Sequence, residues 1–351
     1  MRNVLYTHTH THTWARNNVL DVMKGVTILL MVYAHVSNAE IVNRVVFSFH
    51  MPLFFLLGGY FIKDNNDIKQ QWLPYTIKSA KRLLLPYFVT MFLMCLWVWR
   101  FEIVKLRFNL SWLPLLNVLW GSGDMLVTQY GRLYVGPLWF LFAIFVAREV
   151  FYLIQCIADK CFDRQESKYM PIVLMTIVLS VFSIVLYPFV QPLPWNPLPG
   201  IAALMFFVIG WSLRKIVLPL WLKIALVVCW VLVIVLNLRI DLRACEYGII
   251  PLNVLGACGG TLVMYYLSKG LEFLSHKSVV INCVAKFMTW CGMGSLAILC
   301  MHSLDLMGGV SSYFSGFIGG SSVVKMCLHF AIPLLLTWII YKIGVFRKIY
   351  Y

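Results

Sequence analysis

Residues 21–35 read DVMKGVTILLMVYAH, an apolar stretch that carries two ionisable side chains eleven positions apart, Lys24 and His35. In a membrane helix, hydrocarbon penalises such a side chain by at least ~2.5 kcal/mol unless protein or water surrounds it. At about 100° per residue the two side chains project from the same face, about 16 Å apart along the axis. Asp21 lies within about 60° of that face. A charged face in an apolar helix indicates a functional site.

The composition identifies the wider setting of this stretch. The chain has 351 residues, of which 61% are hydrophobic and 12% charged, and its mean hydropathy is +0.81. Soluble domains average about 25% charged residues, so the composition indicates a polytopic membrane protein. Apolar stretches about 17–25 residues long predict ten membrane spans. They lie near 22–37, 45–62, 84–100, 134–157, 170–190, 198–213, 216–238, 247–267, 283–306 and 323–346.

The basic residues predict the orientation of the chain. Ten spans place both termini on one side of the membrane. The segments on that side carry sixteen of the assigned Lys and Arg residues, and the opposite segments carry six. Cytoplasmic loops are enriched in Lys and Arg, so we expect both termini in the cytoplasm. The net charge of +15 follows largely from this bias. We expect no nucleic-acid partner, because no basic cluster is interleaved with aromatic residues on a soluble domain.

We therefore expect an all-α fold, a polytopic membrane helix bundle in one domain at residues 19–346. A polar cytoplasmic tail at 1–18 precedes it, and a short basic cytoplasmic tail at 347–351 follows it. The first tail contains Thr and His in alternation at 7–13. An extended strand would put its three imidazoles on one side. No Cys or carboxylate nearby completes a closed site, so we predict no catalytic metal.

The second predicted span opens with FHMPLFF at 49–55 and continues to a double glycine, Gly58-Gly59. A proline such as Pro52 is tolerated in the first turn of a helix. The double glycine permits close helix packing or a kink. His50 falls at the outer edge of the membrane, where it either meets an acceptor substrate or faces lipid headgroups.

Together these elements resemble the opening of the acyltransferase-3 family of integral membrane acyltransferases, and within it the fucose 4-O-acetylase-like and polysaccharide O-acetyltransferase group. The family's hallmark is Arg or Lys, ten residues, then His, which Lys24 and His35 match. Later stretches agree in order: KRLLLPY at 81–87, PLWFL at 137–141, and GSLAI at 294–298 followed by His302. The chain departs from the family pattern at Gly58, usually Ser, and at Leu299, usually Tyr.

The resemblance implies an O-acetyltransferase of the bacterial cytoplasmic membrane. It would move acetyl, or another short acyl group such as succinyl, from acyl-CoA to a hydroxyl of a cell-surface or lipid-linked carbohydrate. Acetyl-CoA would be a co-substrate, with no bound cofactor. His35 would be the general base, since imidazole has a suitable unperturbed pKa. Lys24 would bind or orient the donor as a point charge. Asp21 is either its i,i+3 partner or a solvated interfacial charge.

Four further residues each have two alternative roles. Lys81 and Arg82 would receive the CoA phosphates, or they only set the membrane orientation. Trp139 would wall the substrate passage, or it belongs to an interfacial aromatic belt. His302 would bind substrate; it either pairs with Asp305 three residues on or is a satisfied structural histidine.

Two other functions fit the composition. A transporter or flippase of a polysaccharide precursor also has many spans, intramembrane charges and Gly- or Pro-interrupted helices. A membrane subunit that only scaffolds glycan assembly machinery predicts that the charged face is dispensable. The Lys-x₁₀-His block favours acyl transfer. For that function the expected partners are acyl-CoA, the carbohydrate acceptor, membrane lipid and, in association, the glycan assembly machinery.

Overall fold

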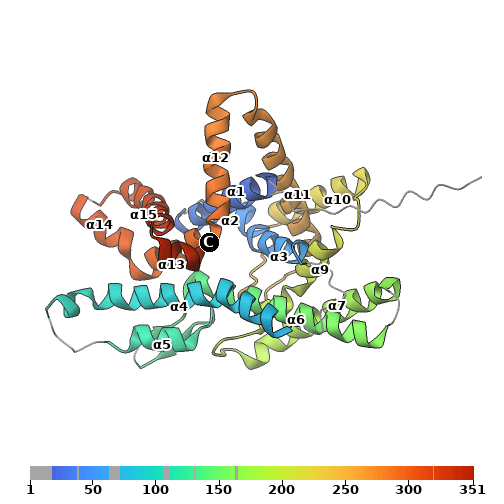
Figure 1. The fold of residues 1–351 in the computed structure, drawn as a ribbon, viewed down its shortest axis with the longest axis horizontal. Coiled ribbons are helices and arrows are strands. Elements are labelled where there is room, and N and C mark those ends of the chain that lie inside the picture. The colour runs from blue at the N-terminus through green and yellow to red at the C-terminus, as the bar shows by residue number, and fades with distance from the viewer. Residues whose placement is uncertain are drawn as a thin grey trace, which may run out of the picture.

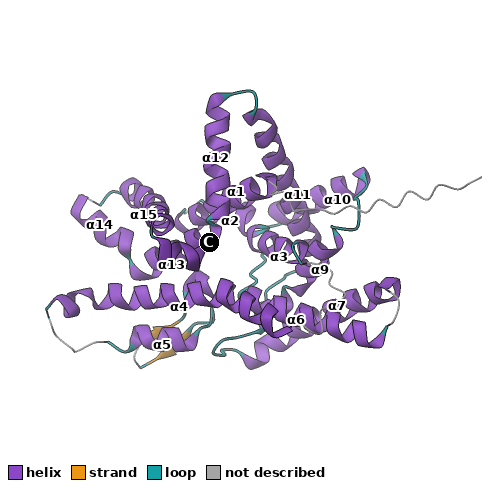
Figure 2. Ribbon diagram, in the orientation of Figure 1, coloured by secondary structure: helices purple, strands orange, loops and turns teal. Residues whose placement is uncertain are grey.

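The structure is a computed structural model that describes residues 18–37, 39–62, 72–105, 111–129, 131–162, 165–318 and 320–351. The polar tail expected at 1–18, with its alternating His tract, lies outside the described residues apart from Asn18. The described part of the chain is almost entirely helical, with one short strand pair beside α5 (Figure 2). The predicted all-α class is confirmed.

The elements follow one another along the chain with short connections (Figure 1). Their bounds are α1 Asn18–Val36, α2 Glu40–Phe47, α3 His50–Tyr60, α4 Trp72–Val104, α5 Leu113–Trp120, β1 Leu126–Thr128, β2 Gly131–Leu133, the 3₁₀ turn η2 Gly136–Leu138, α6 Trp139–Cys161, α7 Gln165–Val190, α8 Leu198–Ala202, α9 Leu204–Ser212, α10 Leu220–Val235, α11 Ile250–Ser275, α12 Val279–Met293, α13 Ser295–Gly308, α14 Val310–Ile318, α15 Ser322–Lys342 and α16 Gly344–Tyr350.

Every predicted span contains a helix, but their lengths differ from the prediction. In the described part of the chain, seven helical segments are long and apolar enough to cross a membrane. They are Asn18–Val36, Glu40–Tyr60, Trp72–Val104, Gly136–Cys161, Lys168–Val190, Ile250–Ser275 and Ser322–Lys342. The chain is therefore an integral, multi-pass membrane protein. The three remaining predicted spans are broken or short.

Glycine and proline explain these three exceptions. The span predicted at 283–306 is divided between α12 and α13, which meet at a 74° bend beside Gly294. The one at 198–213 is divided into α8 and α9, and several prolines precede it. Helix α10 begins directly after Pro219. Glycine favours bends, and proline lacks the N–H group that a helix interior uses, so both are common where helices break or begin, although α4, α7 and α15 continue through internal prolines.

Glycines also let neighbouring helices approach backbone to backbone. A Cβ atom added to Gly59 on α3 would lie 1.9 Å from the carbonyl oxygen of Phe207 on α9. One added to Gly292 on α12 would lie 1.7 Å from the carbonyl oxygen of Asp21 on α1. In lipid, where hydrophobic burial adds little, small residues allow the close packing that associates helices. The predicted role of the double glycine in helix packing is thus met at Gly59.

Two parts of the chain extend or close the bundle. Helices α11 and α12 form a hairpin that projects from one edge of the molecule (Figure 1). Most of the segment expected as a basic tail at 347–351 belongs to α16, which packs against α4. There Tyr350 is buried, and its hydroxyl lies 2.9 Å from Thr90 Oγ1.

We expect Gly59→Ala to destabilise the bundle, because the added methyl group must push α3 away from the α9 backbone. Overpacking of this kind costs about 1–3 kcal/mol. The matched control is Gly270→Ala on α11, where nothing lies within 4 Å of the added Cβ. That change should be neutral or slightly stabilising, because alanine is the better helix former. Thermal unfolding in detergent measures both; equal midpoints for the two variants would contradict the packing role of Gly59.

Candidate active site

A cavity of about 700 Å³ opens at the C-terminal end of α1. Its wall is built from segments far apart in the sequence: the ends of α1 and α2, the start of α3, the turn before β1, the start of α6, the connection between α10 and α11, and α13. Cavities of this size bury a ligand the size of a typical drug. The cavity is therefore large enough to hold a small organic molecule.

Three histidines from different helices gather at this end of α1. His35 is exposed to the cavity, and His50 also lines it. The His35 ring lies 5.5 Å from the His302 ring and 5.5 Å from the Phe47 ring, measured between centroids. Phe47 in turn lies 5.2 Å from the ring of His50. The structure thus brings together all three histidines that the sequence singled out.

The hydrogen bond of His50 defines what its ring can offer. His50 Nδ1 donates to the carbonyl oxygen of Val46 at 3.0 Å, within the first turn of α3 and the end of α2. A neutral imidazole that donates at one nitrogen carries its lone pair on the other. In the neutral form, His50 Nε2 is therefore an acceptor. This residue is buried rather than turned toward lipid headgroups.

His302 differs from a satisfied structural histidine. Its side chain is 0% exposed, and neither ring nitrogen has a hydrogen-bond partner among the described residues. Asp305 does not pair with it, because that carboxylate binds His329 Nδ1 at 2.6 Å and Ser311 Oγ at 2.6 Å. An unpaired buried polar group costs about 1–3 kcal/mol and is concentrated at functional positions. Both expectations for His302 as a structural residue are therefore unmet, and it remains beside His35.

Lys24 lies near the other end of α1. Lys24 Nζ and Asp21 Oδ1 form an ion pair at 2.6 Å, with the i,i+3 geometry that the spacing predicts. Neither residue lines the cavity. Eleven residues of helix separate Lys24 from His35 by about 16 Å along the axis. The structure therefore places the two hallmark residues at two distinct locations on one helix.

Lys81 and Arg82 also lie away from the cavity, on α4, where both are exposed. Arg148 on α6 lies close enough to Arg82 to act on its charge. Next to Arg148, Glu149 Oε2 accepts a hydrogen bond from Thr76 Oγ1 at 2.6 Å. A basic surface group on α4 thus adjoins a polar contact between α4 and α6.

Trp139 is the first residue of α6 and lies in the cavity wall, 9% exposed. Its indole packs over Gly123, where an added Cβ would come within 2.8 Å of the Trp139 ring. A side chain this buried contacts protein rather than the membrane interface. Trp139 therefore belongs to the cavity wall, and its role toward a substrate stays a prediction.

The loop at 236–249 forms much of the cavity wall, although its sequence was not singled out as part of a site. Main-chain hydrogen bonds join Asp241 and Glu246 in both directions, at 2.8 and 2.9 Å. Asn253 Nδ2 donates to the carbonyl oxygens of Arg239 at 3.2 Å and Tyr247 at 2.7 Å. The loop also buries Cys245, and burial raises the pKa of that thiol. The loop is a defined structure and not an unconstrained connection.

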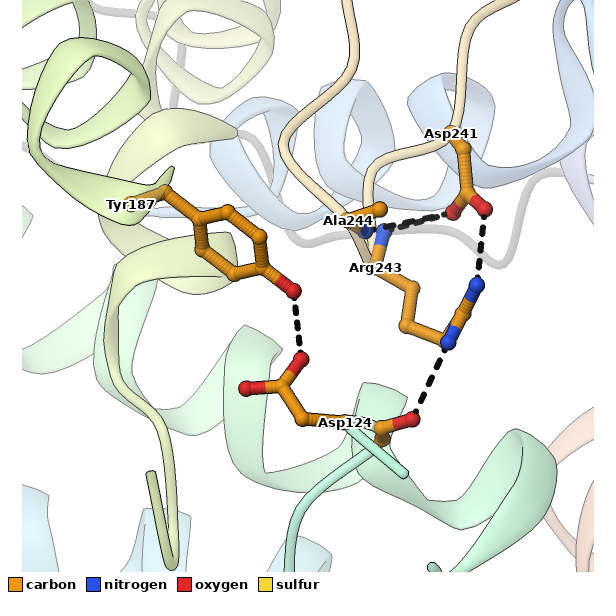
Figure 3. Close-up of polar contacts among 6 residues, drawn as sticks. Asp124, Tyr187, Asp241, Arg243 and Ala244 are labelled. Atoms are coloured by element: carbon orange, nitrogen blue, oxygen red, sulfur yellow. Dashed lines mark hydrogen bonds and ion pairs between the residues drawn. The ribbon is translucent and has the colours of Figure 1, made fainter. Parts of the chain in front are cut away.

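A polar network attaches this loop to the turn before β1 (Figure 3). Arg243 donates to the carbonyl oxygen of Gly123 at 3.2 Å and pairs with Asp241 at 3.2 Å. One residue on, Asp124 accepts from the Tyr187 hydroxyl at 2.5 Å and from Asn196 Nδ2 at 2.8 Å. The one sequence signal was four charged residues within eight positions of a short loop, at 239–246.

The arrangement supplies the parts of a proton-transfer site. Imidazoles act as bases near neutral pH, and His35 reaches the cavity with a second imidazole behind it. Within the described residues, no three His, Cys, Asp or Glu side chains are grouped so that they could hold a metal ion.

We expect Asp124→Ala to destabilise the network around the cavity, because it leaves the Tyr187 hydroxyl and the Asn196 amide as buried, unpaired donors. Each unsatisfied donor costs about 1–3 kcal/mol. Adding Tyr187→Phe removes one of these donors and should recover part of the loss. Thermal unfolding in detergent tests the pair of variants. If the double variant were less stable than Asp124→Ala by the full cost of Tyr187→Phe alone, the two groups would not be coupled.

A family model described as an acyltransferase domain matches residues 17–342. No curated protein and no solved structure matches the chain. The matched region begins one residue before α1 and ends with the last residue of α15, so it contains the cavity and all of the helices that line it. The chain therefore belongs to the acyltransferase-3 family and is a membrane acyltransferase.

Proposed function

We propose that this protein transfers an acetyl group from acetyl-CoA to a hydroxyl of a cell-surface or lipid-linked carbohydrate, with His35 as the general base. The observation that carries the proposal is the position of His35, exposed to a cavity of about 700 Å³ and backed by the unpaired His302. A base must lie within reach of the proton that it removes. Among the described residues of α1, His35 is the titratable one that meets this requirement.

The reaction proceeds by direct acyl transfer. His35 removes the proton from the acceptor hydroxyl while its oxygen attacks the thioester carbonyl carbon. The tetrahedral intermediate then collapses and the carbon–sulfur bond breaks. CoA leaves as a thiolate, and the proton stays on His35. The His302 ring lies 5.5 Å from that of His35, and in this proposal the lone pair on one nitrogen of neutral His302 stabilises the imidazolium form of His35.

The donor enters from the opposite end of α1. Lys24, Lys81 and Arg82 lie on the side that the distribution of basic residues assigns to the cytoplasm, where acyl-CoA is found. Their positive charges suit the phosphates of CoA. The long pantetheine arm then carries the thioester along α1 to His35.

The acceptor enters at the cavity, on the opposite side of the membrane, past His50 and Trp139. The reaction would thus occur across a bacterial cytoplasmic membrane, where glycan assembly machinery supplies the acceptor. The ion pair of Lys24 with Asp21 holds the ammonium group near the donor side. This division places donor and acceptor at the two ends of one helix.

We expect His35→Ala to lower acetyl transfer by about 10²–10⁴-fold, the usual contribution of a general base. Membrane vesicles containing the full chain, labelled acetyl-CoA and membrane glycan provide the assay. The matched control is His276→Ala, which changes an exposed histidine in the turn between α11 and α12. Unchanged acetylation by a correctly folded His35→Ala would remove His35 from the mechanism. Movement of glycan across the vesicle membrane without acetylation would favour a flippase.

We expect Lys24→Gln to raise the KM for acetyl-CoA on the order of tenfold, with a smaller effect on kcat, because one charged hydrogen bond to the donor is lost. Lys24→Arg retains the charge and should retain most of the affinity. Lys160→Gln removes an exposed charge at the end of α6 and serves as the control. A fall in kcat at unchanged KM would instead place Lys24 in the chemical step.

A further inference from the structure

Six of the residues that line the cavity are charged, and we call them the charged rim. Two come from α2 and four from the 236–249 loop. The rim contains as many carboxylates as guanidinium groups, so its formal net charge is zero. Its members are Glu40, Arg44, Arg239, Asp241, Arg243 and Glu246.

Most of these charges already have a partner on the protein. Arg44 and Glu40 are paired at 2.5 Å within α2, and Arg243 and Asp241 at 3.2 Å within the loop. An ionic ligand would have to displace one of these partners or approach a like charge, which costs free energy. A hydroxyl group has no such conflict, because it donates to a carboxylate and accepts from a guanidinium. The rim therefore suits a ligand that is rich in hydroxyls and uncharged.

Two buried polar atoms on α2 have no hydrogen-bond partner on the described part of the protein. They are Asn43 Oδ1, an acceptor, and Arg44 Nε, a donor. Both atoms have almost no accessible surface, so they are not available to a ligand in the cavity, and the polar character of the site depends on the charged rim instead.

The rim is held in place before any ligand binds. Arg243 is fixed from two sides, by Gly123 on the neighbouring turn and by Asp241 on its own loop (Figure 3). The Asp241 side chain also accepts from the main-chain nitrogen of Arg243 at 3.0 Å. A preorganised site loses less entropy when it binds a ligand. Directional contacts to individual hydroxyls are practical only on such a fixed frame.

The cavity wall also contains aromatic side chains. Phe47, Tyr134 and Trp139 all line it. A pyranose ring has an apolar face of C–H groups and an edge of hydroxyls, and this combination matches aromatic surfaces beside paired charges.

We propose that the charged rim binds an uncharged pyranose unit of the acceptor and discriminates against the corresponding uronic acid. This inference rests on the proposed function, since it specifies the class of sugar that would meet His35. Arg44 and Arg243 are already paired with Glu40 and Asp241, and Arg239 lies close to Glu40. The C6 carboxylate of a uronic acid would have to displace a rim carboxylate or lie beside one. Like-charge contacts and broken pairs would therefore oppose its binding.

Binding without transfer tests the proposal. Saturation-transfer difference NMR on the full chain in lipid nanodiscs would use two matched pairs of probes: methyl glucoside with methyl glucuronide, and methyl galactoside with methyl galacturonide. Each pair differs only at C6. We expect a signal from at least one neutral glycoside and a signal on the order of tenfold weaker from its uronide. Equal signals within a pair, or no signal from either neutral glycoside, would overturn the proposal.

A charge variant tests the rim itself. Glu40→Gln with Glu246→Gln removes two exposed carboxylates and leaves Asp241, which supports the loop backbone, in place. This variant should strengthen the uronide signal relative to that of the neutral glycoside. Asp159→Asn, at an ion pair with Lys168 away from the cavity, is the control and should leave the ratio unchanged. An unchanged ratio in the double variant would show that the rim does not select the sugar.

The same measurements separate this proposal from the proposed function. His35→Ala should keep glycoside binding while transfer is lost. Sugar binding in a wild-type protein that transfers no acetyl group would leave the rim proposal standing and remove the transferase mechanism. Acetyl transfer with equal binding of neutral and anionic sugars would do the reverse.

Discussion

An ionisable side chain inside an apolar helix bundle must have a partner or meet water, and this constraint organises the polar groups of this protein. Lys24 meets it through Asp21, and Asp305 meets it through His329 and Ser311. His302 does not meet it with any described residue. The exception lies beside His35, which lines the cavity, but His302 itself is not a lining residue. Of the buried groups that lack a partner in the described part of the chain, His302 is the one beside the histidine proposed as the base.

Helix α1 connects the two halves of the proposed chemistry. Its first turns carry the Lys24–Asp21 ion pair, and its last turn carries His35. The helix is held at a fixed position by its close approach to α12, where Gly25 and Gly292 leave room for backbone contact. Donor binding at one end and acceptor binding at the other then need no large motion of α1. The bend between α12 and α13 carries the chain from this contact to His302.

The sequence predicted those features that depend on local spacing. The lipid penalty and helix geometry were enough to single out Lys24 and His35, and hydropathy was enough to locate a helix in every predicted span. The FHMPLFF stretch pointed to His50 and the family resemblance to His302; the His302 ring lies beside His35, and Phe47 lies between His35 and His50. The helical breaks at Gly294 and around Ala203 were missed as breaks, because hydropathy measures apolar content and not helix continuity.

Features that depend on tertiary contacts could not be predicted from the sequence. Arg243 was counted only as a charge for membrane orientation, since its role requires Gly123 on a turn 120 positions earlier in the chain. The expectation that Asp305 pairs with His302 was reasonable from spacing, but His329 from α15 lies closer. Lys81 and Arg82 remain at a surface where the structure shows no cavity that they share with His35.

In the 236–249 loop, main-chain atoms stabilise the fold, whereas side chains line the cavity. Arg239 and Glu246 stabilise the loop through main-chain atoms, by accepting from Asn253 and by pairing with the Asp241 backbone. Their side chains are not needed for these main-chain contacts; both line the cavity, and both are exposed. A residue whose main chain supports the fold can exchange its side chain at little cost in stability. Substitutions at these two positions can therefore change what the cavity accepts while helix α1 stays unaltered.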